Sequence, residues 1–148
     1  MRFFGLVAAI CISPAGIATA GETRIAEDQT PTGKFMTATE IRPILTATKG
    51  NWVAVREYGG QDLVYFTHLL SWRCGLHSVQ YSINGGDIQE FPIPECPADI
   101  AQPNAIPDDA LIYLSLDKGV VQSVEIELLY DDLGVDSAMF ERAAILIP

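Results

Sequence analysis

The chain has 148 residues, which suffice for one domain but not for two of ordinary size. Nine basic side chains oppose nineteen acidic ones, so the formal net charge is −10 at pH 7. A surface this acidic repels phosphate backbones and anionic lipids, which argues against nucleic acids and membrane surfaces as partners.

The first twenty residues have the pattern of a signal peptide. Arg2 precedes an apolar stretch over residues 3–12, and Ala-Thr-Ala at positions 18–20 is a small-residue cleavage site. We expect cleavage before Gly21, with a retained, uncleaved anchor as the alternative. Cleavage removes one basic residue and no acidic one, leaving eight against nineteen and a charge of −11. The expected location is the periplasm or the secreted fluid.

No membrane insertion is expected after cleavage, because no later run approaches the roughly 18 continuous apolar residues of a membrane helix. Cys11 leaves with the signal peptide, so Cys74 and Cys96 are the cysteines of the mature chain. An even pair in an exported chain predicts a disulfide. By the chain-entropy argument, closing a loop of this length stabilises the fold by about 3 kcal/mol.

Residues 21–36 are polar and have no apolar period, which predicts a flexible leader. Thr37 and Glu40 then form a capping-box pattern, which is typical of a helix start. Four residues on one helical face, three of them apolar, follow before a stop at Gly50: Ile41, Ile44, Leu45 and Thr48. The sequence therefore predicts one short N-terminal helix, shortened or kinked by Pro43, which removes a backbone donor.

From residue 51 the apolar period changes to two, which is typical of strands. The runs over 51–58 and 62–70 flank Gly59 and Gly60, and this spacing predicts a hairpin that folds back at these glycines or one residue later. One face of the hairpin carries Val53, Val55, Val64 and Phe66. The other face is also largely apolar, with Trp52, Ala54, Tyr65 and Leu69. We therefore expect the hairpin to be central in a two-layer fold.

A second hairpin is predicted from the runs 78–83 and 87–93 around Asn84-Gly85-Gly86. Residues opposite each other in a hairpin have a constant sum of numbers, and a three-residue loop gives 170. Cys74 and Cys96 also sum to 170, so we expect the disulfide at the open end of this hairpin. The apolar phase shifts between Ile88 and Phe91, which predicts a bulge there.

The segment over residues 92–109 contains five prolines and predicts an extended connection between two sheets. A third hairpin is predicted from residues 110–116 and 121–130 around Asp117-Lys118-Gly119. In its second strand four apolar side chains point one way: Val124, Ile126, Leu128 and Tyr130. Residues 137–146 complete the chain as a last strand.

These runs amount to about seven strands and one short helix. We expect a mainly β fold in a single domain over residues 37–148, built as an antiparallel β-sandwich of immunoglobulin-like general architecture. A small closed barrel is the alternative.

Two histidines, His68 and His77, flank a corner formed by Trp72, Arg73 and Cys74. With an acidic third ligand the histidines could bind zinc or copper, and Cys74 beside Arg73 could act as a thiolate. These residues support an alternative function as a metal- or thiol-dependent hydrolase using His68, His77 and Cys74. However, no motif has metal-ligand spacing, and a partnered histidine at the edge of the core is the simpler interpretation.

Three acidic residues, Asp131, Asp132 and Asp136, are weak candidates for a calcium site. Their turn lacks the length and the terminal glutamate of an EF-hand loop, and an exposed acidic hairpin tip explains the same residues. We therefore expect no metal and no cofactor.

A loop tryptophan beside an arginine is typical of residues that dominate protein interfaces. We therefore predict a binding surface formed by Tyr65, His68, Trp72, Arg73 and His77, with a tryptophan that covers the disulfide as the alternative. The expected function is non-catalytic: a disulfide-stapled binding or accessory module whose partner is an envelope protein or a small ligand. A structural subunit of an envelope assembly is a further alternative.

Overall fold

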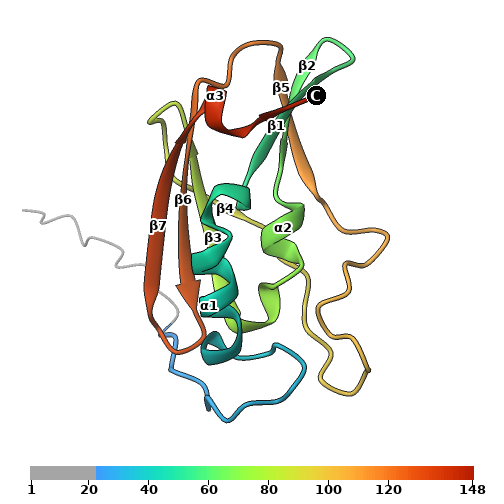
Figure 1. Cartoon of the computed structure of the whole chain (residues 1–148), viewed down its shortest axis with the longest axis vertical. Coiled ribbons are helices and arrows are strands. Elements are labelled where there is room, and N and C mark those ends of the chain that lie inside the picture. The colour runs from blue at the N-terminus through green and yellow to red at the C-terminus, as the bar shows by residue number, and fades with distance from the viewer. Residues whose placement is uncertain (1–22) are drawn as a thin grey trace, which may run out of the picture.

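The computed structural model of the chain describes residues 23–148, which form two four-stranded sheets (Figure 1). Sheet A, in the order β5-β2-β1-β8, comprises β1 (Ala54–Tyr58), β2 (Gln61–Tyr65), β5 (Tyr113–Asp117) and β8 (Leu146–Ile147). Sheet B, in the order β4-β3-β6-β7, comprises β3 (Leu76–Ile83), β4 (Gln89–Phe91), β6 (Ser123–Tyr130) and β7 (Val135–Glu141). The strand pairings are antiparallel except that of β1 with β8, so the prediction of a mainly β, antiparallel fold is confirmed.

The helices of the described part are short. They are α1 (Ala38–Ala47), α2 (Thr67–Leu70) and α3 (Arg142–Ile145), with 3-10 turns η1 (Lys49–Asn51) and η2 (Arg73–Gly75). The helix that the sequence predicts as N-terminal is α1, which lies at positions 38–47 and not at the N-terminus of the chain. No helix within residues 23–148 is long and apolar enough to cross a membrane.

The expected number of strands needs correction. Residues 23–148 form eight strands, one more than expected, and these make two separate sheets instead of one closed barrel. The signal peptide expected over residues 1–20 lies outside the described residues.

Buried side chains of both sheets and of α1 belong to one hydrophobic core, which gives a sandwich-like arrangement. In Figure 1, β6 and β7 lie on the left, β1, β2 and β5 on the upper right, and α1 between them toward the viewer. Phe66, directly after β2, stacks on Phe91 of β4 with ring centroids 4.0 Å apart. Trp52 is fully buried, and its indole Nε1 donates to the carbonyl of Leu45 at 2.9 Å. These contacts join the sheets and the helix, and each large apolar side chain contributes about 2 kcal/mol by burial.

Helix α1 begins with the predicted capping box, in which the Thr37 hydroxyl accepts from Glu40 N and the Glu40 carboxylate accepts from Thr37 N. Its residues Ile41 and Leu45 are fully buried, as the apolar period predicts. Pro43 lies inside the helix on its exposed side, where water can reach the carbonyl that lacks its usual donor.

The hairpin predicted around Gly59 and Gly60 is confirmed as β1–β2, with Val55 opposite Val64. Both glycines have positive φ values, 61° and 76°, as a two-residue type I′ turn requires. The second strand is shorter than expected, because the chain turns into α2. Leu69, predicted on the outer face of that strand, is instead buried in α2.

The second predicted hairpin is confirmed as β3–β4 with the expected register. Residues directly opposite each other sum to 170, as in the pair of Val79 with Phe91. The predicted bulge after Ile88 is wrong, because β4 pairs regularly with β3. The irregularity lies between Leu76 and Ser78, where β3 pairs with β6.

The third predicted hairpin, around residues 117–119, is wrong. β5 pairs with β2 in sheet A, whereas β6 pairs with β3 and β7 in sheet B. The chain crosses between the sheets at Val121, which is fully buried. Its N–H donates to the Asp62 carboxylate at 3.1 Å and its carbonyl accepts from Arg142 at 2.7 Å. These bonds allow the crossing because no buried backbone group of Val121 stays unpaired.

The last predicted strand, over residues 137–146, is divided into three elements. Its first part belongs to β7, an edge strand of sheet B, and its last residue belongs to β8, which pairs in parallel with β1 in sheet A. Helix α3 lies between them and buries Ile145. The change of direction brings the chain from one sheet to the other, which a single continuous strand cannot do.

Two irregular segments lie against this framework. The proline-rich connection predicted over residues 92–109 is confirmed, since it joins β4 of sheet B to β5 of sheet A without helix or strand (Figure 1). Residues 23–36, expected as a flexible leader, also lack helix and strand and are hydrogen-bonded to the domain. The Gln29 side chain donates to Asp131 at 2.8 Å, which connects this segment to the turn between β6 and β7.

Candidate functional site

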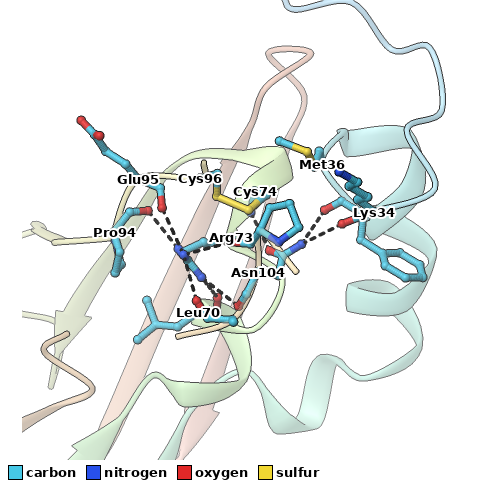
Figure 2. The surroundings of a disulfide bond; sticks show 12 residues. Lys34, Met36, Leu70, Arg73, Cys74, Pro94, Glu95, Cys96 and Asn104 are labelled. Atoms are coloured by element: carbon cyan, nitrogen blue, oxygen red, sulfur yellow. Dashed lines mark hydrogen bonds between the residues drawn. A yellow bond between two sulfur atoms is a disulfide. The ribbon is translucent and has the colours of Figure 1, made fainter. Parts of the chain in front are cut away.

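Arg73, expected at a binding surface, is 1% exposed and is surrounded by backbone carbonyls (Figure 2). Its guanidinium donates to six carbonyl oxygens at 2.9–3.3 Å, those of Leu70, Pro94, Glu95, Pro103, Asn104 and Ala105. Burial lowers the pKa of Arg73, but an arginine stays charged in proteins. The side chain therefore fastens the proline-rich connection to η2 from inside the molecule and is not presented at the surface.

The predicted disulfide between Cys74 and Cys96 is present, with the two Cα atoms 5.5 Å apart. Asn104 adds a second link beside it (Figure 2). Its side chain accepts from Cys74 N at 3.0 Å and donates to the carbonyl of Phe35 at 2.8 Å. The corner thus joins η2, the proline-rich connection and the segment before α1. A disulfide of this kind indicates an oxidising, extracytoplasmic environment.

Trp72 and His77 both contact the segment that precedes α1. The ring of Trp72 is half-buried and packs edge-on against Phe35, with centroids 5.3 Å apart. His77 Nε2 lies 3.2 Å from the carbonyl oxygen of Ile25, and its Nδ1 lies 3.8 Å from the Glu27 carboxylate. These contacts attach the segment to the domain.

Tyr65 and His68, in contrast, line one open cavity of about 450 Å³. The cavity has eight lining residues: Asn51, Ala54, Arg56, Tyr65, Thr67, His68, Ile147 and Pro148. Of the five residues predicted to form one surface, the structure therefore brings Tyr65 and His68 together at this cavity.

The cavity lies on the outer face of sheet A. Ala54 is directly opposite Tyr65 in the β1–β2 pair, and Arg56 is opposite Ile147 in the parallel β1–β8 pair. Alternate residues of a strand point to opposite faces, so these side chains point away from the buried Val55. The strands thus provide the floor of the cavity, and the start of α2 with its His68 provides one wall.

The orientation of the His68 ring is fixed by Thr48. The Thr48 hydroxyl lies 2.7 Å from the carbonyl oxygen of Ile44, to which it donates its single proton, and 2.8 Å from His68 Nε2. The Thr48 oxygen must therefore accept from His68 Nε2–H. Burial lowers the pKa of His68, which favours the neutral ring with Nδ1 as an acceptor. Nδ1 has no hydrogen-bond partner within the described residues.

Tyr65 is held by its neighbour in the sheet. Its ring packs against that of Tyr113, which is opposite it in the β2–β5 pair, with centroids 5.3 Å apart. Tyr113 is 39% exposed, so the pair extends an aromatic surface from the cavity across sheet A. Aromatic surfaces of this kind provide apolar contact area for a ligand.

Arg56 is the charged residue of this site that the sequence analysis missed. It is half-buried, and its guanidinium carbon lies 4.9 Å from the ring centroid of Tyr58. The predicted hairpin and its alternation already place Arg56 on the same face as Tyr65, so a signal for it existed. Ile147 had no such signal, because its position depends on the parallel pairing of β8 with β1.

The weak calcium candidates already have protein partners. Asp132 accepts from Arg42 at 2.6 Å, and Asp136 accepts from Lys49 at 3.0 Å. The buried Asp131 accepts through Oδ1 from the backbone N–H of Ala38 at 2.9 Å. No group of three or more potential metal-binding side chains occurs within residues 23–148. In the structure these aspartates connect the β6–β7 region to α1 and η1.

The cavity combines apolar walls with side chains that donate and accept hydrogen bonds, which is the usual composition of a small-molecule site.

No family model, no curated protein and no solved structure matches the chain.

Proposed function

We propose that the protein is a periplasmic or secreted, non-catalytic binding module whose ligand site is the cavity at Tyr65 and His68. The observation that carries this proposal is the cavity of about 450 Å³ on the outer face of sheet A. Its volume lies in the range of about 300–1,000 Å³ that small-molecule sites occupy. A small ligand of the cell envelope is the partner that such a cavity suits best.

The surroundings of the candidate catalytic side chains also support a binding role. The Cys74 sulfur is bonded to Cys96, so it cannot attack a substrate while the disulfide is intact. His68 donates to a threonine hydroxyl rather than to a carboxylate that would make it a stronger base. His77 contacts the segment before α1 and does not line the cavity.

The rigid framework around the cavity favours binding as well. The ion pair of Asp62 with Arg142 attaches β2 of sheet A to α3, and both sheets contribute side chains to one hydrophobic core. Tyr65 is held by Tyr113 and His68 by Thr48. A site that is ordered before the ligand arrives loses less conformational entropy on binding.

Amide chemical shifts can test the site with a fragment library of neutral, basic and acidic compounds. We expect at least one class of fragment to shift the amides of Asn51, Thr67 and His68. The Ala54→Trp variant, which fills the cavity from β1, should abolish these shifts. Met139→Trp is the matched control, since Met139 is 67% exposed on β7 of the other sheet. If no fragment shifts the cavity amides, or if Ala54→Trp leaves the shifts unchanged, the proposed site is refuted.

A further inference from the structure

The side chains of residues 23–148 that line the cavity include a cation and no acidic group, although the molecule as a whole is acidic. The chain has nineteen acidic residues, yet none of the described side chains that line the cavity is acidic. Arg56 is the permanent cation among them. A positively charged side chain that has no ion-pair partner attracts an anion, even on a protein whose net charge is negative.

Arg56 also differs from the other cationic side chains of residues 23–148. Each of the others forms an ion pair with a carboxylate or donates to backbone carbonyls: Arg24, Lys34, Arg42, Lys49, Arg73, Lys118 and Arg142. Arg56 makes no ion pair and no hydrogen bond with any residue of the described part. Its guanidinium, positioned over the Tyr58 ring, keeps its planar set of donors for an external acceptor.

We propose that the cavity binds an organic carboxylate with an apolar body, and that Arg56 pairs with the carboxylate. This inference rests on the proposed function. The planar guanidinium fits the two oxygens of a carboxylate through parallel hydrogen bonds. A single cation matches a single negative charge, whereas a phosphate dianion in so acidic a protein needs more positive charge than Arg56 supplies.

The remaining walls match the body of such a ligand. Ala54, Tyr65 and Ile147 provide apolar contact on the floor of the cavity. His68 Nδ1 and the Asn51 side chain add polar atoms that can bond a hydroxyl or amide group of the ligand. The carboxylate therefore supplies the charge recognition, and the apolar body supplies the contact area.

The carboxylate has two chemical sources, a free small acid or the C-terminus of a peptide. Calorimetric titration of the oxidised protein can compare 3-phenylpropanoate with 3-phenylpropanamide, its neutral analogue. A second arm compares acetyl-Ala-Phe carrying a free carboxylate with the same peptide carrying a C-terminal amide. We expect each carboxylate to bind about tenfold or more tightly than its amide, as charge-assisted hydrogen bonds allow. The tighter of the two carboxylates identifies the source.

Substitution of the arginine completes the test. Arg56→Gln should weaken carboxylate binding about tenfold and leave amide binding unchanged. The carboxylate affinity of Arg56→Lys should lie between those of the parent protein and of Arg56→Gln. Arg24→Gln removes the same charge near Glu90, away from the cavity lining, and should have no effect. Thermal unfolding of Arg56→Gln checks that the variant is folded.

Equal affinities for carboxylate and amide, no binding of either carboxylate, or an Arg56→Gln variant that binds carboxylate normally would each overturn the assigned ligand class. The fragment experiment decides the proposed function separately. Neutral fragments that shift the cavity amides would retain the cavity as a binding site while refuting the carboxylate. The absence of any fragment at the cavity would refute both.

Discussion

Asp62 and Arg142, eighty residues apart in the chain, form a two-pronged ion pair with N···O distances of 2.6 and 3.0 Å. The Asp62 side chain is fully buried, and the same carboxylate accepts from Val121 N. Because Arg142 also donates to the Val121 carbonyl, the pair joins β2, the crossing between the sheets, and α3. The place at which the chain changes sheets therefore depends on one carboxylate.

We expect Asp62→Asn to lower the free energy of unfolding by about 3 kcal/mol, because it leaves a largely buried guanidinium without its buried charged partner. Equilibrium urea unfolding measures this change. Glu57→Gln is the control, since Glu57 pairs with the same arginine at 2.7 Å but its side chain is 42% exposed. The control should cost less than about 1 kcal/mol. If the two variants lost equal free energy of unfolding, the burial of Asp62 would not explain how strongly its ion pair stabilises the fold.

Removing the Arg73 guanidinium should destabilise the fold by at least about 3 kcal/mol, because Arg73→Met leaves several carbonyls near the disulfide without a donor. Arg73→Lys keeps the charge but has fewer donors, so an intermediate loss is expected. Urea unfolding with the disulfide intact gives both values. A stability of Arg73→Met within about 1 kcal/mol of the parent would contradict the assigned structural role.

The Glu40 carboxylate predicts a loss of stability in acid. Burial alone raises the pKa of Glu40, but hydrogen bonds from Thr32, Gly33, Met36 and Thr37 outweigh it and lower the pKa to about 2. The folded protein therefore binds fewer protons than the unfolded chain between about pH 4.5 and pH 2, so stability falls as the pH is lowered through this range.

Urea unfolding at several pH values measures this dependence. Glu40→Gln should be less stable at pH 7 and should lose less stability between pH 5 and pH 2 than the parent protein. Glu125→Gln, on the exposed side of β6, removes an equal charge and should keep the acid dependence. If the stability of Glu40→Gln depended on pH as steeply as that of the parent protein, the acid dependence would not come from Glu40.

Replacing both Cys74 and Cys96 by alanine should lower the free energy of unfolding by about 3 kcal/mol, through the greater entropy of the unfolded chain. Urea unfolding of this variant and of the oxidised parent measures the difference. Thiol titration of the denatured, unreduced protein cleaved at the expected site should detect no free thiol. Two free thiols would contradict formation of the disulfide in the native compartment.

Local patterns in the sequence predicted several elements correctly. The capping box of Thr37 and Glu40 fixed the start of α1, because both partners lie within one turn of helix. The glycine turns predicted the hairpins β1–β2 and β3–β4 and, for β3–β4, also the register. Since opposite positions in a hairpin follow from the turn alone, the sum of 170 also predicted that the disulfide lies at the open end of β3–β4.

The candidate site was predicted less completely. Tyr65 and His68 lie at the cavity, whereas Arg73 is enclosed by carbonyls from a segment about thirty residues away. An arginine beside a tryptophan has the same sequence signature whether it is exposed or buried. Arg56 became a candidate ligand-binding residue because the structure shows it against the Tyr58 ring, without an ion-pair partner among the described residues.

The sequence by itself determined the mainly β character, the helix start, two hairpins, the register of one of them and the disulfide, because each follows from neighbouring residues or from a turn that connects them. The tertiary structure decided that β5 and β6 belong to different sheets, that the last predicted strand is divided, and that Arg56 and His68 meet at one cavity. The physical reason is that these features depend on contacts between distant segments, such as Asp62 with Arg142 and β1 with β8. Alternation of apolar and polar residues indicates which face of a strand is buried, but it does not specify the strand that lies beside it.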